Sequence, residues 1–360
     1  MKSYRVLVIN PGSTSTKVAL FDDEKEVFTE VLRHDEKKLE KYGGITNQYE
    51  FRRDIILGAL EKHDIDPKTL DGAVGRGGLI YPVSGGTFRV NDKMIEHLKV
   101  GILGQHASNL GGLIAKAIGD KLDIPSFIVD PVVVDEMHEY ARFSGHPKFE
   151  RKSIFHALNQ KAVARQVAEQ MDKKYTDVNL IVVHLGGGIS VGAHKKGRVI
   201  DVNNALNGDG PFTPERSGGL PVGDLAKLCF SGEVTHAEVK KMIKGQGGIK
   251  AYLGTTDLIQ VTKDIEKGDD DKKKVFLAMA YQVAKEIGTC AAVLKGDIDG
   301  IVLSGGIAYS DLFCDFIKEY TEWMAKVYVI PGEAEMEALA MGGLRVLRGT
   351  EEANEYKPDA

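Results

Sequence analysis

A weak internal repeat constrains the fold of this chain more than any other feature of its sequence. An apolar strand, a small-residue turn and a second apolar strand occur over residues 5–21 and again over residues 180–200, where a third strand follows. The turns read Asn-Pro-Gly-Ser-Thr-Ser-Thr from Asn10 and His-Leu-Gly-Gly-Gly-Ile-Ser from His184. Self-similarity of this kind marks a repeated architecture. We therefore predict two similar lobes, with a cleft between them that holds a nucleotide and a second substrate.

The rest of the chain has the pattern of an α/β protein. Strand-like runs at 72–74, 126–129, 300–303 and 327–330 alternate with amphipathic stretches typical of helices, notably 155–171, 272–294 and 335–347. A length of 360 residues exceeds the usual limit for one hydrophobic core. We predict an N-terminal lobe of residues 1–135 plus 338–360, including a returning C-terminal helix, and a C-terminal lobe of residues 136–337. The polar tail, 349–360, is expected to fray.

Composition excludes several classes of protein. Cys229, Cys290 and Cys314 show neither metal-ligand nor disulfide spacing, so we expect buried thiols in a reducing compartment. The sequence shows no export signal and no apolar run long enough to span a membrane, which predicts a cytoplasmic protein that does not bind membranes. A net charge of -5 with both signs interspersed does not favour binding to nucleic acid.

Three turns could bind a nucleotide. In the first, Ser13 and its small neighbours leave backbone N–H groups and hydroxyls free to approach phosphate oxygens, and Lys17 adds positive charge. A Walker A loop is excluded, because the glycine–lysine spacing is absent and a strand follows. An ordinary Ser/Thr-rich hairpin remains an alternative interpretation. In the second, the consecutive glycines tolerate positive φ and allow close backbone approach to an anion, at Gly186, Gly187 and Gly188.

The third turn contains Gly305 and Gly306, which leave the apolar run 301–303 and precede a helical pattern. Open α/β sheets bind ligands at turns that leave strand ends, here the adenosine. Taken in order, the three turns resemble the phosphate 1, phosphate 2 and adenosine elements of the acetate and propionate/butyrate kinase family. Further matches cover nearly the whole chain, at 76–78, 105–109, 130–132, 153–156 and 211–214.

The resemblance implies two duplicated ribonuclease H-like lobes, of the actin/hexokinase/acetate-kinase type, around an ATP cleft. It also implies Mg²⁺ as cofactor, ATP/ADP and a short-chain fatty acid or acyl phosphate as small-molecule partners, and a homo-oligomer. Pro11, Gly187 and the run Ala157–Gln160 differ from the acetate kinase pattern and resemble the butyrate kinase branch. The implied reaction is reversible phosphoryl transfer between ATP and butyrate. A branched-chain fatty-acid kinase, or a non-catalytic nucleotide switch of the same fold, stays open as an alternative.

The resemblance also implies roles for individual residues. Arg76 would hold the acyl carboxylate and the phosphoryl group, His106 would contact the substrate, and His156 would stabilise the transferring phosphoryl group. Asp130 matches a position usually given a proton-transfer role, and we expect it instead to orient the phosphate-side network. Without the resemblance, Arg76 would be read as a surface ion-pair residue and His156 as a capping or core histidine. The implied ATP-binding residues are Ser13, Lys17, His184, Gly186, Gly187, Gly188, Asp257, Gly305 and Gly306.

Two assignments depend on departures from the family pattern or on neighbouring acids. Acetate kinases carry a second catalytic arginine in a G-T-R-x-G-D context that this chain lacks, and Arg216 is the nearest candidate to supply the same charge. Asn10 and Glu335 match positions associated with Mg²⁺, with Glu337 as the alternative acid. Glu335 also suits an acidic helix N-terminus, where it would complement the helix dipole.

Overall fold

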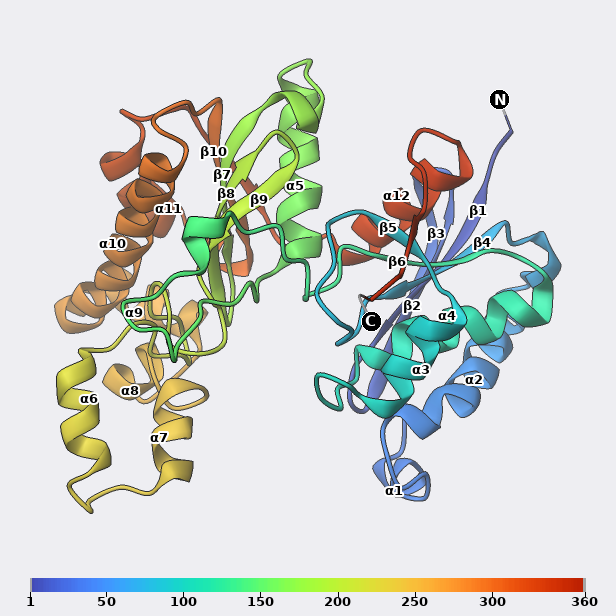
Figure 1. Ribbon diagram of the computed structural model, residues 1–360, viewed down its shortest axis with the longest axis horizontal. Coiled ribbons are helices and arrows are strands. Elements are labelled where there is room, and N and C mark those ends of the chain that lie inside the picture. Colours follow the sequence, from blue (N-terminus) through green and yellow to red (C-terminus); the bar gives the residue numbers. More distant parts are fainter. Residues whose placement is uncertain (1, 359–360) are drawn as a thin grey trace. The chain divides into compact units, whose positions relative to one another are not determined.

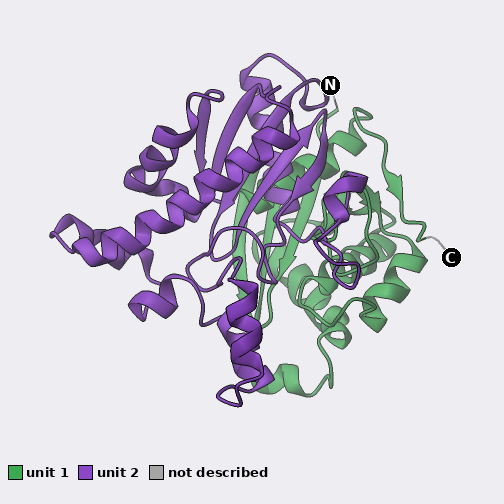
Figure 2. Cartoon of the chain, turned by 60° about the vertical axis from the view of Figure 1, so that its left-hand side comes forward, with its two compact units in different colours: residues 1–134, 334–360 green, residues 135–333 purple. Residues whose placement is uncertain are grey.

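The computed structural model describes residues 2–358. The chain divides into two compact units, residues 1–134 with 334–360 and residues 135–333 (Figure 2). We call them unit 1 and unit 2. The sequence predicts lobes that end at residues 135 and 337, and these boundaries stay a prediction.

Unit 1 is built on a seven-stranded sheet in the order β12-β5-β6-β4-β1-β2-β3 (Figure 1). The first three strands form an antiparallel meander, and β4 and β6 continue the sheet beside β1 in parallel. Parallel neighbours place their carboxyl ends at one edge, where ligands bind in open sheets. The strands are β1 (Arg5–Pro11), β2 (Ser15–Asp22), β3 (Lys25–Arg33), β4 (Gly72–Arg76), β5 (Thr87–Arg89), β6 (Ser126–Val129) and β12 (Asn354–Glu355).

Helices cover both faces of the unit 1 sheet. They are α1 (Glu36–Glu40), α2 (Tyr49–Lys62), α3 (Asp92–Val100), α4 (Asn109–Leu122) and α12 (Glu335–Leu347). A Cβ added at Gly75 of β4 would clash with the backbone of α4, whereas one added at Gly343 of α12 would meet Val74. Because successive strand residues point to opposite faces, α4 and α12 cover opposite faces of the sheet.

Unit 2 holds a five-stranded sheet in the order β11-β10-β7-β8-β9. Helix α5 (Ala157–Gln170) covers one face, and α10 (Asp270–Val293) and α11 (Asp311–Thr321) contribute to the core on the other. Shorter helices link β9 to α10 (Figure 1): α6 (Val222–Cys229), α7 (His236–Ile243), α8 (Ile249–Leu253) and α9 (Leu258–Glu266). The strands are β7 (Asn179–Leu185), β8 (Ile189–Lys195), β9 (Arg198–Val202), β10 (Gly300–Gly305) and β11 (Val327–Pro331).

The two sheets repeat one arrangement. The order β6-β4-β1-β2-β3 in unit 1 corresponds to β11-β10-β7-β8-β9 in unit 2, with the same parallel and antiparallel pairings. The predicted internal repeat is therefore confirmed, as are the predicted strands and the three long helices. Strands β3, β5 and β12 were not predicted from the sequence.

Two predictions about the periphery are wrong. The tail from Gly349 does not fray up to residue 358, because β12 pairs with β5 and the side chain of Tyr356 is buried with its hydroxyl 2.7 Å from His97 Nδ1. Residues 359–360 lie outside the described residues. Cys290 and Cys314 are buried as predicted, but Cys229 is exposed.

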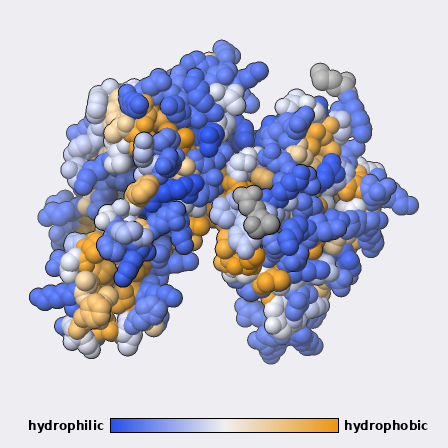
Figure 3. Space-filling view, in the orientation of Figure 1, coloured by the Kyte–Doolittle hydropathy of each residue, from blue (hydrophilic) through white to orange (hydrophobic). Residues whose placement is uncertain are grey.

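Helix α6 is the clearest exposed apolar element. It buries none of its residues, and Phe230, which follows it, is 92% exposed. Apolar colour gathers over this helix in the space-filling view (Figure 3). Within residues 2–358, no helix combines the length and apolar character needed to span a bilayer.

Candidate active site

Unit 1 gathers three predicted site residues at the carboxyl end of its central strands. Asn10 lies near the end of β1, Arg76 is the last residue of β4, and Glu335 is the first residue of α12. Arg76 contacts both carboxylate oxygens of Glu335, at 3.0 Å from Nη1 to Oε2 and 2.9 Å from Nη2 to Oε1. Asn10 Nδ2 donates to the same carboxylate at 2.8 Å, and its Oδ1 accepts from Arg76 at 3.3 Å. The cluster presents a partly exposed cation beside hard oxygen atoms.

Strand register explains this cluster. Ile9 and Gly75 are paired on parallel β1 and β4, so Asn10 and Arg76 follow together at the strand ends. Lys17 on β2 lies directly opposite Asn10, so its side chain leaves the same face of the sheet, and it is exposed. Three predicted residues therefore share one face near the first turn.

Arg52 of α2 holds the first turn from its buried side. This residue was not predicted from the sequence. Its side chain is fully buried, and it donates to the carbonyl oxygens of Gly12, Ser13 and Ser15 at 2.8, 2.6 and 2.9 Å. It also donates to the Gln48 side chain at 2.7 Å. Burial lowers the pKa of Arg52 to about 10, which leaves the guanidinium charged at neutral pH. Because the carbonyl oxygens are engaged inside, the exposed Ser13 side chain lies on the solvent side of the turn.

Asp130 and His106 occupy other parts of unit 1. Asp130 follows β6 with a positive φ of 35°, and its buried carboxylate accepts from the Gly86 N–H at 2.7 Å. This contact ties two loops together. His106 is exposed just before α4, with Nδ1 2.9 Å from the Ser108 hydroxyl. The functional roles implied for both residues stay predictions.

In unit 2, His156 and His184 stack on one another. Their ring centroids are 3.8 Å apart and their planes differ by 14°. His184 Nδ1 lies 2.8 Å from Asn159 Oδ1, and its Nε2 lies 3.1 Å from a Glu333 carboxylate oxygen. His156 precedes α5 and places Nδ1 2.9 Å from the Ser190 hydroxyl. Neighbouring polar side chains therefore contact Nδ1 of both rings and also Nε2 of His184.

The glycine turn lies directly against these rings. The Gly186 N–H donates to the Gly188 carbonyl at 3.1 Å, which closes the turn. A Cβ added at Gly186 would lie 2.9 Å from His184 Nε2. A Cβ added at Gly188 would clash with the Arg216 guanidinium and lie 3.2 Å from His156 Cε1. A side chain at 186 or 188 would displace the Arg216 guanidinium or the His184 ring, so glycine at these positions leaves both groups in place.

Arg216 brings a cation to the same turn. Its Nη1 donates to the Ala205 carbonyl at 2.6 Å, and its backbone N–H donates to the Thr213 hydroxyl at 3.0 Å. That hydroxyl in turn donates to the Gly187 carbonyl at 2.8 Å. Burial lowers the pKa of Arg216, and its buried Nε has no hydrogen-bond partner within residues 2–358. Unit 2 thus joins His156, His184, Arg216 and the glycine turn in one cluster.

The third turn adjoins this cluster, whereas Asp257 has a local role. Gly305 has a φ of +93°, and a Cβ there would clash with the Leu185 carbonyl at the end of β7. Gly306 is exposed with open space beside it. Asp257 is exposed and caps α9 by accepting from the Gln260 N–H at 3.0 Å. The adenosine role of these residues stays a prediction.

Comparison with known proteins now places the chain. A family model described as the acetokinase family matches residues 145–321. Butyrate kinase 1 of Clostridium acetobutylicum is 56% identical over 354 residues, which cover 98% of this chain and 100% of that protein. The chain belongs to the acetokinase family.

Solved structures agree with the acetokinase assignment at the level of the fold. Acetate kinase from Porphyromonas gingivalis superposes with a TM-score of 0.81 at 19% identity, over 96% of this chain and 100% of that one. Propionate kinase from Francisella tularensis subsp. tularensis gives 0.72 at 19% identity, over 94% and 98%. The predicted fold class, a duplicated α/β architecture of acetate-kinase type, is confirmed.

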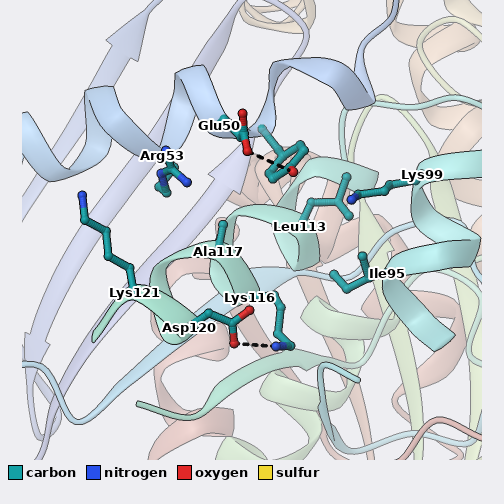
Figure 4. Close-up of a pocket in the computed structure, with 10 residues that line it drawn as sticks. Glu50, Arg53, Ile95, Lys99, Leu113, Lys116, Ala117, Asp120 and Lys121 are labelled. Carbon is teal, nitrogen blue, oxygen red and sulfur yellow. Dashed lines mark hydrogen bonds and ion pairs between the residues drawn. The ribbon is translucent and has the colours of Figure 1, made fainter. Parts of the chain in front are cut away.

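A further groove in this acetokinase contains none of the predicted site residues. It lies between α2, α3 and α4 (Figure 4). Lys116 pairs with Asp120 across one turn of α4, and Lys99 lies over the ring of Tyr49. Its lining residues are Tyr49, Glu50, Arg53, Ile95, Lys99, Leu113, Lys116, Ala117, Asp120 and Lys121.

Several residues of the two clusters were not among the predicted site residues. Ser190 and Asn159 lie inside quoted motifs, so their proximity to the histidines could have been suspected. Arg52 follows Gln48 and precedes Ile56 by four residues each, on a buried helix face. A cation on a helix face whose other buried residues in α2 are apolar was the available signal.

Proposed function

We propose that this acetokinase catalyses reversible phosphoryl transfer between ATP and butyrate, giving butyryl phosphate and ADP. The observation that carries the choice of butyrate is the similarity over essentially the full chain to the Clostridium acetobutylicum butyrate kinase. The geometry supports a kinase, because each unit places an arginine, Arg76 or Arg216, near a small-residue turn whose backbone could bind phosphate.

The chemistry requires charge neutralisation rather than a general base. A carboxylate is ionised near neutral pH and can attack the γ-phosphorus of ATP directly. Phosphoryl transfer spreads negative charge over the equatorial oxygens, which hydrogen-bond donors and cations stabilise. In the proposed mechanism Arg76 holds the acyl carboxylate, and His156 and Arg216 stabilise the transferring group.

The remaining predicted residues support binding. Ser13, Lys17, His184 and Gly186–Gly188 would hold the ATP phosphates, and Gly305, Gly306 and Asp257 the adenosine. His106 would contact the acyl substrate. Because the reaction moves no proton, Asp130 would orient the phosphate-side loops, a role its contact with Gly86 suits.

Mg²⁺ fits the donors that unit 1 offers. Asn10 and Glu335 supply an amide oxygen and a carboxylate, and Mg²⁺ prefers few protein oxygens while keeping waters and phosphate ligands. Within the part of the chain that the structure describes, no group of three or more His, Cys, Asp or Glu residues could hold a metal alone. Glu337 is exposed, which makes Glu335 the better candidate. When bound, Mg²⁺ would neutralise phosphate charge.

The setting of the enzyme follows from the same proposal. Its partners are small molecules, ATP/ADP and the short-chain acid or acyl phosphate, and we expect a homo-oligomer that acts in the cytoplasm. Sizing chromatography with light scattering would test the assembly.

Trapping the acyl phosphate tests the reaction. The protein is incubated with ATP, Mg²⁺, hydroxylamine and one acid from acetate, propionate, butyrate, isobutyrate or valerate. We expect hydroxamate formation to be greatest with butyrate. A maximum at isobutyrate would assign a branched-chain kinase instead. ATP binding without hydroxamate from any acid would overturn the kinase and favour a nucleotide switch.

A further inference from the structure

The run His156–Gln160 departs from the acetate kinase pattern, and the mechanism above uses only its first residue. Gln160, in the first turn of α5, is fully buried. Its Nε2 lies 2.9 Å from the Ser190 carbonyl and 2.8 Å from the Ser190 hydroxyl. Its Oε1 lies 3.0 Å from His194 Nε2, and His194 Nδ1 lies 2.8 Å from the Tyr175 hydroxyl. A buried polar chain therefore leads from Tyr175 to Ser190, which contacts His156.

Donor and acceptor chemistry fixes the protons along this chain. The Ser190 carbonyl can only accept, so the amide nitrogen of Gln160 faces it and the amide oxygen faces His194. His194 must then carry its proton on Nε2, and its Nδ1 accepts from Tyr175. Burial, with Lys161 and Arg165 nearby, lowers the pKa of His194 well below its ordinary value, which agrees with a neutral ring.

The same logic reaches His156. The Ser190 hydroxyl oxygen accepts from Gln160 Nε2 at 2.8 Å and from the His156 backbone N–H at 3.4 Å, which occupies both lone pairs, so the hydroxyl hydrogen donates to His156 Nδ1 at 2.9 Å. A ring that accepts at Nδ1 carries its proton on Nε2. His156 is then a neutral donor beside Gly188 and Arg216, where the proposed function places the transferring phosphoryl group.

We propose that Gln160 is a positioning residue for phosphoryl transfer, which acts through Ser190 to hold His156 as a neutral Nε2–H donor. The predicted change in kcat rests on the proposed function, whereas the predicted protonation of His156 does not. Titratable and charged groups near His156 include His184, stacked on it from β7, Arg216 beside Gly188, and Glu333, which contacts His184 Nε2. Gln160 hydrogen-bonds to none of these three side chains, so we expect its replacement to leave them in place.

Gln160→Met tests the proposal by keeping length and removing both polar atoms. Without the Gln160 donor, Ser190 is free to accept from a protonated His156 Nδ1, so His156 gains a proton more readily. We expect kcat to fall about 10- to 100-fold, as for other residues that orient a functional group. The KM for ATP should stay within about twofold, since Gln160 forms no hydrogen bond with the glycines 186–188. The acid limb of the kcat–pH profile should move to higher pH.

A matched control separates positioning from stability. Thr321 is buried in unit 2 and donates its hydroxyl to the Ile317 carbonyl at 2.7 Å, outside the polar chain. Thr321→Val therefore removes a buried hydrogen bond, and it should lower the melting temperature while leaving kcat and its pH profile unchanged. A Gln160→Met profile that matches the control would overturn the proposal.

A second variant and a direct readout cover the case in which Gln160→Met does not fold. A Cβ at Gly192 would lie 2.6 Å from Gln160 Oε1, so Gly192→Ala should push the amide out of line while keeping every polar residue. Titration of the His156 ring by NMR should show a higher midpoint in either variant than in wild type. An unchanged midpoint would contradict the proposal whatever the activity. An inactive wild type with a shifted midpoint would reject only the proposed function.

Discussion

The two glycine-rich hairpins occupy equivalent places but are built differently. Asn10 on β1 corresponds to His184 on β7, and the residues paired opposite them are Lys17 and Ser190. In unit 1 a single buried cation, Arg52, holds the turn by its carbonyl oxygens. In unit 2 the cation beside the turn, Arg216, donates to the Ala205 carbonyl, and the two histidines are contacted by Ser190 of β8 and Asn159 of α5.

This difference suggests a division of labour within one repeated scaffold. A buried arginine keeps the first turn rigid and leaves outward-facing charges at Lys17 and Arg76. The second turn instead lies beside imidazoles whose ring nitrogens are engaged by neighbouring polar side chains. We therefore expect the first hairpin to be sensitive in stability and the second in turnover.

The largest effect should follow from removing the cation under the first turn. Arg52→Met leaves several backbone carbonyls and Gln48 without their donor. We expect the free energy of unfolding, measured in urea, to fall by about 3–5 kcal/mol. The neighbouring Arg53 forms only a surface ion pair with Asp54, so Arg53→Met should change the free energy of unfolding by about 1 kcal/mol or less. Equal losses of unfolding free energy in the two variants would show that Arg52 does not hold the first turn.

Turnover should fall most at the second turn. Arg216→Ala removes a partly desolvated cation from the proposed transition-state site, and we expect kcat to drop about 100- to 1,000-fold. Arg151→Ala is the matched control, because Arg151 is also a half-buried arginine of unit 2 but pairs with Asp201. Hydroxamate assays on both variants, with melting curves, decide the matter. A folded Arg216→Ala enzyme with near-normal kcat would refute the assignment.

These contrasts also show what a sequence reveals. Strands such as Val6–Ile9 are buried on both faces and read as apolar runs, whereas β3 mixes charged and apolar residues, buries none of them, lies at a sheet edge and was missed. Arg52 and Tyr356 were missed because composition treats a cation or a polar tail as surface. The resemblance supplied Asn10 and Glu335 as candidates, but only folding brings together residues 325 positions apart. Gln160 required knowledge of which carbonyl it faces.

Stability should respond to pH with opposite sign in the two units. Burial beside Arg52 lowers the pKa of His34, under the first hairpin, to about 4. Its native form is neutral, so its contribution is complete above pH 6.5 and is lost as pH falls toward 4. Burial raises the pKa of Glu286 in unit 2 to about 7, with Asp209 adding to the shift. Its native form binds a proton, so its contribution is complete below its ordinary value and is lost as pH rises through 7.

Replacing each group separately tests this opposition. One proton bound differently by the native and unfolded states changes the free energy of unfolding by at most about 1.4 kcal/mol per pH unit. We measure the free energy of unfolding in urea between pH 4 and 7.5. In His34→Gln, which keeps a hydrogen-bond partner for Thr16, this free energy should rise less with pH than in wild type. Glu286→Gln should instead lose part of the decline in the free energy of unfolding toward pH 7. If both variants changed the dependence of the free energy of unfolding on pH in the same direction, His34 and Glu286 would not act with opposite sign in units 1 and 2.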